Sequence, residues 1–382
     1  MKQIFFAILI TISNILYSQN NSGNIFKYDT SFFSNNKIDC IRNDNVISLH
    51  NDTIFSIDNS QKTNDYINIL GFSINNNSFF ELKAYFYNDD YLKDLKFTPI
   101  VDFWFKNDTL YLLLFKSIYK FGRNNDSYNL ISKIELDFSP NRAMLLSNGN
   151  VLLYKSNFKS DNNMYMFDCE NNKVLYNKEL QSPIPILSIF QPRDILCTDN
   201  YHIYYSPANE YIINIYDYNF NLVDSIVYSK KKWQSFPINR VKNVLEKTKM
   251  QVDIIEALSD DVRDKYSSIM RLFILDDKLI VMYFMKEDGK NLYLYDVWKN
   301  IKGNWKLILE GINDYDKQNL KTKDRFIPFS KFVFYKGCIY RFSSLTPIFR
   351  DNFKSEKEYI KAYENYQIEN DCLLGIEKLW IK

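Results

Sequence analysis

Hydrophobic and polar positions alternate along this chain in short runs, a pattern that predicts β-strands joined by tight turns. The pattern is clearest from Asp102 to Leu136, where four apolar runs follow one another within about 35 residues. Asn107-Asp108 separates the first two runs, and a polar segment from Arg123 to Asp126 separates the last two. Runs rich in aromatic and β-branched residues, bounded by Asn, Asp and Gly, are typical of hairpins. We therefore predict a unit of four antiparallel strands here.

The same unit recurs, and the turn between its first two strands marks each recurrence. The candidate turns are Asn51-Asp52, Asn107-Asp108, Asn148-Gly149, Asp199-Asn200, Asp276-Asp277 and Lys336-Gly337. The shortest interval, 41 residues from Asp108 to Gly149, matches the period of about 40–50 residues of several repeats with four strands. Six turns predict six repeats, with insertions in the longer intervals.

A second marker is an aromatic residue followed by Asp at the end of the predicted third strand. It occurs at Asp168, Asp217 and Asp296. An Asp at a strand end can begin a turn by accepting hydrogen bonds from the backbone that follows it. A fourth strand is predicted after each of these positions, over Val174–Leu180, Leu222–Val227 and Trp305–Leu309.

The strands of one unit differ in how apolar they are. Thr109 to Phe115 is apolar at nearly every residue, which predicts a strand covered on both faces. Leu130 to Glu135 alternates, as an outer strand does. The units thus resemble the blades of exported six-bladed β-propellers of the TolB-like or NHL-like kind, over most of Asp39 to Leu345. The resemblance implies an all-β fold with six blades of four antiparallel strands. Two β-sandwiches in tandem are the alternative.

The longest interval between turns contains a different period. After Pro237, apolar residues recur at spacings of three and four as far as Leu258, which predicts an amphipathic helix. We predict a helical insertion over about 235–266, after the fourth blade. It packs on the propeller or, alternatively, docks a partner. A charged helix is predicted over 351–366, and Cys372 to Ile381 predicts a last strand that helps to close the ring.

The N-terminus predicts export. Lys2 precedes an apolar run from Ile4 to Ile15, and Ser18 supplies a small residue before a polar chain. This is typical of a secretory signal peptide over residues 1–18, which leaves 19–382 as a single domain outside the cytoplasm, whether periplasmic, surface-bound or secreted. An uncleaved membrane anchor is the alternative. No later stretch is long and apolar enough to predict a transmembrane segment in the mature chain.

Composition narrows the range of functions. The net charge is only +2, so nucleic acid is not an expected partner. Asn is abundant and Gly scarce, at 9 residues, which indicates that Asn supplies the turns. The 5 cysteines are widely spaced, and we favour buried thiols over a disulfide framework.

Motifs for catalysis and for cofactors do not stand out. The 2 histidines, His50 and His202, are far apart in sequence and do not predict a metal site. No phosphate-binding glycine loop, G-x-S-x-G motif or sialidase box occurs. We therefore predict no cofactor, no metal and no catalytic residue. A hydrolase or lyase acting on glycans or lactone-like substrates remains the alternative, and a calcium-dependent form is included. Such enzymes need two carboxylates at a fixed distance, and a single sequence does not show which of its acidic residues lie at that distance.

Aligning the units on their turns brings charged residues to the start of several innermost strands. These residues are Asp102, Arg142, Arg193, Asp194, Arg271 and Lys331. Innermost strands border the axis of a propeller, so these side chains predict a binding site at the channel mouth. The ligand could be a small molecule, a glycan or a protein. The alternative is an ordinary polar channel without a ligand.

We expect residues 1–18 to be absent from the exported protein, because a positive start, an apolar run and a small residue direct cleavage. N-terminal sequencing of exported material should begin near Gln19. Recovery of Met1 would contradict cleavage and favour the anchor.

Overall fold

The computed structural model describes residues 26–33, 46–62, 65–86, 98–155, 162–180, 195–207, 210–235, 266–287, 290–313, 331–345 and 373–381, with a few single residues between 355 and 362. The predicted signal peptide, the insertion between 236 and 265 and nearly all of the segment 351–366 lie outside this part of the chain. Regular structure within it is almost entirely β-strand. No described helix is long and apolar enough to cross a membrane.

Three sheets are meanders of four consecutive antiparallel strands. The first contains β10 (Arg142–Leu145), β11 (Val151–Lys155), β12 (Asn162–Asp168) and β13 (Lys173–Leu180). The second contains β14 (Leu196–Thr198), β15 (His202–Tyr205), β16 (Ile212–Asp217) and β17 (Leu222–Val227). The third contains β18 (Ser268–Leu275), β19 (Lys278–Glu287), β20 (Lys290–Ile301) and β21 (Asn304–Asn313).

Two further meanders are joined at their outer edges into one sheet of eight strands. One half contains β2 (Val46–His50), β3 (Thr53–Lys62), β4 (Tyr66–Ser73) and β5 (Ser78–Tyr85). The other contains β6 (Asp102–Lys106), β7 (Thr109–Leu113), β8 (Ser117–Asn124) and β9 (Ser127–Glu135), which confirms the unit predicted from Asp102 to Leu136. The outermost strands β5 and β9 pair in parallel, with Lys83 opposite Ser127.

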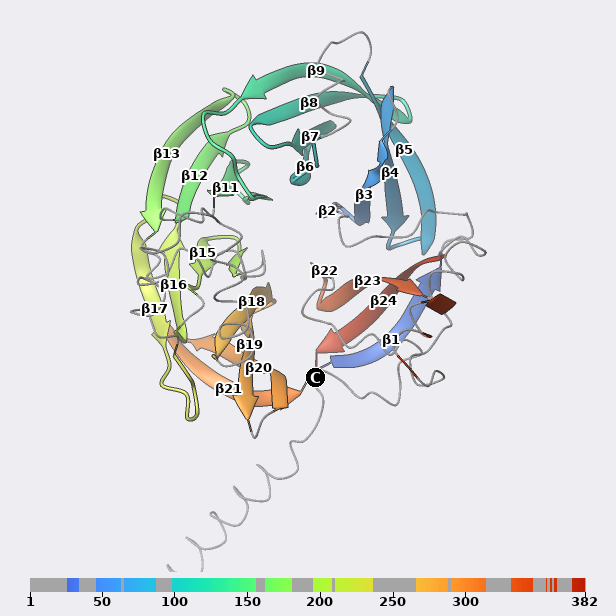
Figure 1. Cartoon of the computed structure of the whole chain (residues 1–382). Helices are drawn as coiled ribbons and strands as arrows, with labels where there is room; N and C mark the ends of the chain where they lie inside the picture. The colour runs from blue at the N-terminus through green and yellow to red at the C-terminus, as the bar shows by residue number, and fades with distance from the viewer. Residues whose placement is uncertain are drawn as a thin grey trace, which may run out of the picture.

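The remaining sheet combines both ends of the chain. It contains β22 (Lys331–Tyr335), β23 (Cys338–Leu345) and β24 (Leu373–Ile381), followed by β1 (Phe26–Phe33) as its outer strand. β1 runs antiparallel to β24, with Phe26 opposite Ile381. The sheets surround a central opening, as in a β-propeller (Figure 1). The predicted last strand is thus confirmed as β24, and the N-terminal strand completes the same sheet.

The turn prediction is confirmed in detail. All six predicted pairs lie between the first and second strands of a meander. Asn51, Asn107 and Asp276 adopt φ values of 53°, 53° and 54°. In turns between third and fourth strands, Asn77 and Asn125 adopt 51° and 54°. Asn therefore supplies five of the ten non-glycine residues in the left-handed region within the described part of the chain.

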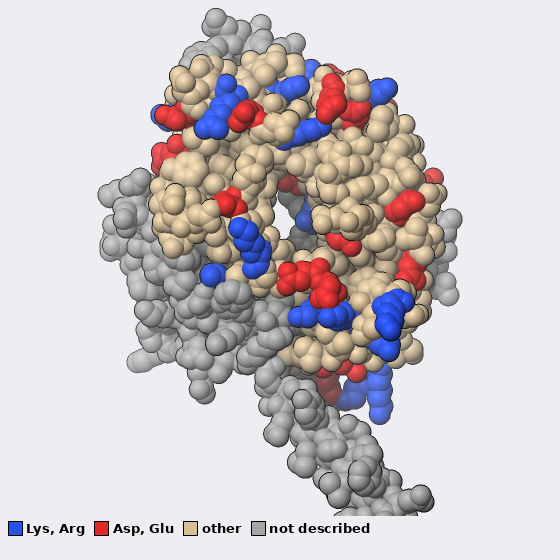
Figure 2. All heavy atoms as spheres, turned by 180° about the vertical axis from the view of Figure 1, so that it is seen from behind, with Lys and Arg blue, Asp and Glu red and all other residues tan. Residues whose placement is uncertain are grey.

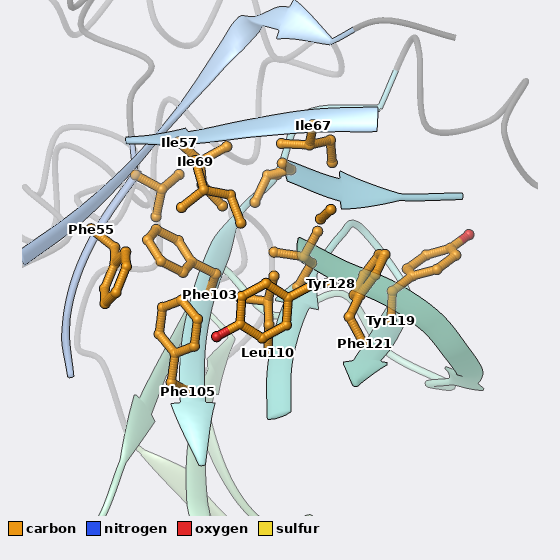
Figure 3. Packing of buried hydrophobic residues seen from close by; sticks show 14 of the residues in the cluster. Phe55, Ile57, Ile67, Ile69, Phe103, Phe105, Leu110, Tyr119, Phe121 and Tyr128 are labelled. Atoms are coloured by element: carbon orange, nitrogen blue, oxygen red, sulfur yellow. The ribbon is translucent and has the colours of Figure 1, made fainter. Parts of the chain in front are cut away.

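Each meander packs both of its faces on neighbours. In β11, Leu152 and Tyr154 pack with the β14–β17 sheet, whereas Val151 and Leu153 pack with the β6–β9 half. Figure 3 shows a comparable contact, in which side chains from β3 and β4 meet side chains from β6 and β7. The described residues form six such buried clusters, each made by two neighbouring meanders.

The two ends of the ring differ because strands alternate in direction. Turns between first and second strands and between third and fourth strands lie at one end, and all of them are short. Connections between second and third strands, and from each meander to the next, lie at the other end. We call this end the long-connection face. The described residues that flank the undescribed segments 87–97, 181–194, 236–265 and 314–330 all lie there.

Three cysteines are described, and all three are buried thiols: Cys169, Cys197 and Cys338. Burial raises the pKa of Cys169 to about 11, which keeps it protonated at neutral pH. This confirms the prediction for these three residues. Cys40 and Cys372 lie outside the described residues.

Leu110→Ala should destabilise the protein by about 2–5 kcal/mol, because Leu110 is fully buried between two meanders and the change leaves a cavity. Leu222→Ala is the matched control, since Leu222 is 57% exposed on an outer strand and should change stability by about 0.5 kcal/mol or less. Urea denaturation measures both. Equal midpoints for the two variants would contradict the packing.

Candidate functional site

Four of the six predicted site residues lie on described innermost strands. Each pairs with a residue of the second strand: Asp102 with Leu113, Arg142 with Tyr154, Arg271 with Met282 and Lys331 with Phe342. Arg193 and Asp194 lie outside the described residues, immediately before Ile195.

The four residues occupy equivalent positions relative to their turns. Asp102 lies four residues before Lys106, the last paired residue of β6. Arg271 and Lys331 lie four residues before the last paired residues Leu275 and Tyr335. Arg142 lies four residues before Leu146, whose N–H bonds Asn150 across the turn. All four therefore stand at the same level, at the long-connection face.

A longer turn accounts for the position of Arg142. Asp102, Arg271 and Lys331 lie six residues before the second residue of their turn pairs, whereas Arg142 lies seven before Gly149. The N–H of Leu146 bonds the carbonyl of Asn150 across a turn of three residues, which supplies the extra residue. The β-bulge between Ile269 and Arg271 lies on the far side of Arg271 from its turn and does not alter this register.

These positions face the next meander rather than the axis itself. Asp102 alternates with Phe103 and so shares a face with Trp104, which packs against the β10–β13 sheet. Likewise Arg142 shares a face with Leu146, which packs on the β14–β17 sheet. Arg271 is only 6% exposed. The charged groups of Asp102, Arg142 and Arg271 thus lie between meanders at one end of the ring.

The carboxylate of Asp102 connects two meanders. Its Oδ1 accepts a hydrogen bond from the N–H of Phe103 at 3.0 Å, and its Oδ2 accepts one from the N–H of Ala143 on β10 at 2.9 Å. β6 and β10 lie beside each other in the ring. Asp102 therefore satisfies a backbone donor of the neighbouring innermost strand.

The equivalent positions of the other two meanders are apolar. Val46 lies four residues before His50, the last paired residue of β2. Ile195 lies four residues before Asp199, whose N–H bonds the carbonyl of His202. The six equivalent positions therefore hold three cations, one carboxylate and two aliphatic residues. Figure 2 shows the central opening on one face of the ring, with acidic and basic side chains around it.

The described residues contain no group of three His, Cys, Asp or Glu side chains placed to hold a metal ion. The two histidines lie in separate hairpins. His202 Nδ1 lies 3.4 Å from Asp199 Oδ1. His50 stacks on Phe105 with ring centroids 5.2 Å apart, and burial lowers its pKa.

A hollow of about 790 Å³ lies at the opposite end of the ring, over the short turns of the β6–β9 half. Its lining consists of Asp108, Arg123, Asn125 and Asp126. Arg123 Nη1 pairs with Asp108 Oδ1 at 3.4 Å, and both side chains are mostly exposed. An exposed pair of this kind contributes little binding energy.

Sequence reasoning missed a buried charged cluster centred on Asp296. The marker of an aromatic residue followed by Asp is confirmed at Asp168 and Asp217, which end their strands and accept hydrogen bonds from the turn backbone. It is wrong at Asp296, because β20 continues to Ile301 and Asp296 is fully buried. Its partner is Lys230, with Nζ 2.9 Å from Oδ2. The sequence did offer one signal for this irregular site. Gly311 is a lone glycine within the facing strand, and such a residue often marks a bulge.

Comparison with known proteins concerns the fold. No family model and no curated protein matches the chain. A candidate exported protein from Bacteroides fragilis has a TM-score of 0.58 and 12% identity, over 94% of this chain and 96% of that one. A member of the DUF4221 family from Bacteroides vulgatus has a TM-score of 0.50 and 9% identity, over 94% and 99%. At such identities the likeness shows a shared fold alone.

Asp102→Ala should destabilise the protein by about 1–3 kcal/mol, because it leaves the N–H groups of Phe103 and Ala143 without their acceptor. Asp102→Asn keeps one oxygen and should cost less. Asp224→Ala is the control. The carboxylate of Asp224 accepts a hydrogen bond from the N–H of the adjacent residue, Ser225, at an exposed position. Thermal unfolding measures all three. An Asp102→Ala effect no larger than that of Asp224→Ala would contradict the bridging role.

Proposed function

We propose that this protein is an exported, non-catalytic binding module built on a six-bladed β-propeller, and that it binds an anionic ligand at the channel mouth on the long-connection face. The observation that carries the proposal is the register of Arg142, Arg271 and Lys331. Three cations hold equivalent positions on different innermost strands, at the same end of the ring.

Six blades are supported by three observations that agree. Six turns of the predicted kind each join a first and a second strand. Six buried clusters each combine two neighbouring meanders. The last meander gains its fourth strand from β1, so the ring closes without a seventh unit.

Export is supported by the N-terminal sequence pattern, in which an apolar run follows Lys2 and ends near Ser18. One of the similar solved structures is also of a candidate exported protein. Location outside the cytoplasm is therefore part of the proposal.

An anionic ligand follows from the charges at the equivalent positions. The three cations share one end of the ring, and an anion bound there would accept charge-assisted hydrogen bonds from them. The single carboxylate, Asp102, already accepts two backbone N–H groups. An enzyme that cleaves glycans would instead need two carboxylates at this level. The six equivalent positions supply one.

Citrate, phosphate and acidic sugars should raise the melting temperature of the protein in proportion to the logarithm of their concentration above the dissociation constant. The double variant Arg142→Ala, Lys331→Ala should abolish most of that rise, because it removes two of the three cations. Differential scanning fluorimetry measures the slope against concentration.

The control variant is Lys173→Ala, Lys306→Ala, which removes the same charge from exposed positions on outer strands. Citrate and phosphate also stabilise proteins generally by exclusion from their surfaces. The site is therefore measured by the difference in slope between the two double variants. Equal slopes would remove the anion site and leave the propeller.

A further inference from the structure

Lys230 and Asp296 form an unusually enclosed ion pair between two meanders. Lys230 follows β17, and Asp296 lies on β20 of the next sheet. The Lys230 Nζ lies 3.0 and 2.9 Å from the two oxygens of Asp296 and 3.1 Å from Glu310 Oε1. The side chains of Lys230 and Asp296 are 5% and 0% exposed. One amine thus contacts a buried carboxylate, Asp296, and a second carboxylate, Glu310, whose side chain is 48% exposed.

Aromatic rings surround the amine. Lys230 Nζ lies 4.3 Å from the ring centroid of Tyr283, 5.5 Å from that of Tyr228 and 5.8 Å from that of Tyr211. Burial, and after it the charge of Asp296, raises the pKa of Tyr211 and of Tyr283. Burial together with Glu310 raises the pKa of Tyr228 to about 12. The three phenols therefore stay neutral and retain their protons as donors.

The carboxyl group of Asp296 is held by further donors. Tyr211 donates its O–H to Oδ2 at 2.8 Å, and the N–H of Gly311 donates to Oδ1 at 2.7 Å. The Trp298 Nε1–H donates to the Tyr211 oxygen at 3.0 Å. Fixed donors on both oxygens stabilise negative charge that develops there when a nucleophile attacks the carboxyl carbon.

We propose that Lys230 and Asp296 condense to an intramolecular amide bond, with Glu310 carrying the protons. Glu310 takes a proton from the Lys230 ammonium and delivers it to an oxygen of Asp296, which gives a neutral amine and a neutral carboxylic acid. The Nζ lone pair then attacks Cγ of Asp296 and forms the N–C bond. The oxyanion forms on the oxygen that stays unprotonated, where it accepts from Tyr211 if it is Oδ2 and from Gly311 if it is Oδ1.

The second half of the reaction expels water. Glu310 takes another proton from the nitrogen and delivers it to the departing hydroxyl, and the C–O bond breaks. One water molecule leaves, the amide keeps one hydrogen on nitrogen, and Glu310 ends as the carboxylate it began as. The step needs no oxidant, reductant or added group.

Two physical effects favour this bond at this place. Reacting groups held in contact have effective concentrations of about 10⁵–10⁸ M when they are well aligned, which offsets the cost of forming an amide from an acid and an amine. Two buried ions also carry a desolvation cost that the neutral amide does not have. Exclusion of bulk water slows the reverse hydrolysis.

The bond would join two blades beside the largest insertion. Gln234 and Ser267 flank the segment 236–265 and hydrogen-bond to each other, the N–H of Gln234 to Ser267 Oγ at 3.0 Å and the N–H of Ser267 to the Gln234 carbonyl at 2.9 Å. Lys230 lies just before this base. A covalent link from Lys230 to Asp296 therefore fixes the β14–β17 sheet to the β18–β21 sheet where the insertion departs.

Intact mass spectrometry of the purified, denatured full chain tests the proposal. The mass should fall below that of the sequence by one water molecule, and digestion should yield a branched peptide that joins Lys230 to Asp296. Asp296→Asn should lose ammonia in place of water, because its amide releases nitrogen. Lys230→Arg and Glu310→Gln should keep the full mass.

The pair of Lys232 with Glu287 is the internal control. These residues are also in direct contact, but the Lys232 side chain is 58% exposed, so the pair should give no branched peptide. Wild-type protein with the full mass and no branched peptide, after prolonged incubation, would overturn the proposal and leave an ordinary buried ion pair. A loss of water that persists in Glu310→Gln would overturn the role of Glu310. The wild-type mass alone decides whether the amide bond forms, even where a variant fails to fold.

Discussion

Each meander buries apolar side chains on both faces, so none can be stable without a neighbour on either side. β11 illustrates the constraint, since Leu152 and Leu153 are both fully buried but pack on different sheets. A row of such sheets has two unsatisfied ends until it curves into a ring. The sheet of β22 to β24 packs on β2 to β5 and completes the ring, and β1 pairs with β24, so both ends of the chain contribute to one sheet.

The same packing explains where the polar groups lie. Side chains of an innermost strand alternate between two crevices, so a charged residue at the strand start enters the space between meanders. A polar group there must find a partner because water is scarce. Asp102 accepts a hydrogen bond from the N–H of Ala143. Asp296 accepts hydrogen bonds from Lys230, Tyr211 and Gly311. Asp102 joins two neighbouring innermost strands near the axis, and Asp296 joins two sheets farther from the axis.

The two ends of the ring differ in their connections and in their charged residues. Short turns with Asn at positive φ close one end, and they leave little chain for recognition. The other end carries the described residues that flank the longest undescribed segments, and the equivalent positions of Arg142, Arg271 and Lys331. Loops placed on a rigid scaffold are where binding residues usually occur. The proposed ligand site and the proposed amide bond both belong to this end.

The sequence alone determined the strands, the six turns and their spacing, and the presence of charged residues at the starts of innermost strands. These features are local, because a hairpin's register follows from its turn and from the alternation of residues beside it. Only the tertiary structure decided the contacts between residues that lie far apart in the sequence. β5 paired with β9, and β1 completed the sheet of β22 to β24. Asp296 carries the same local pattern as Asp168 and Asp217, yet it is buried. The reason is that Lys230, 66 residues away in the sequence, supplies the opposite charge across a sheet interface that the local pattern does not encode.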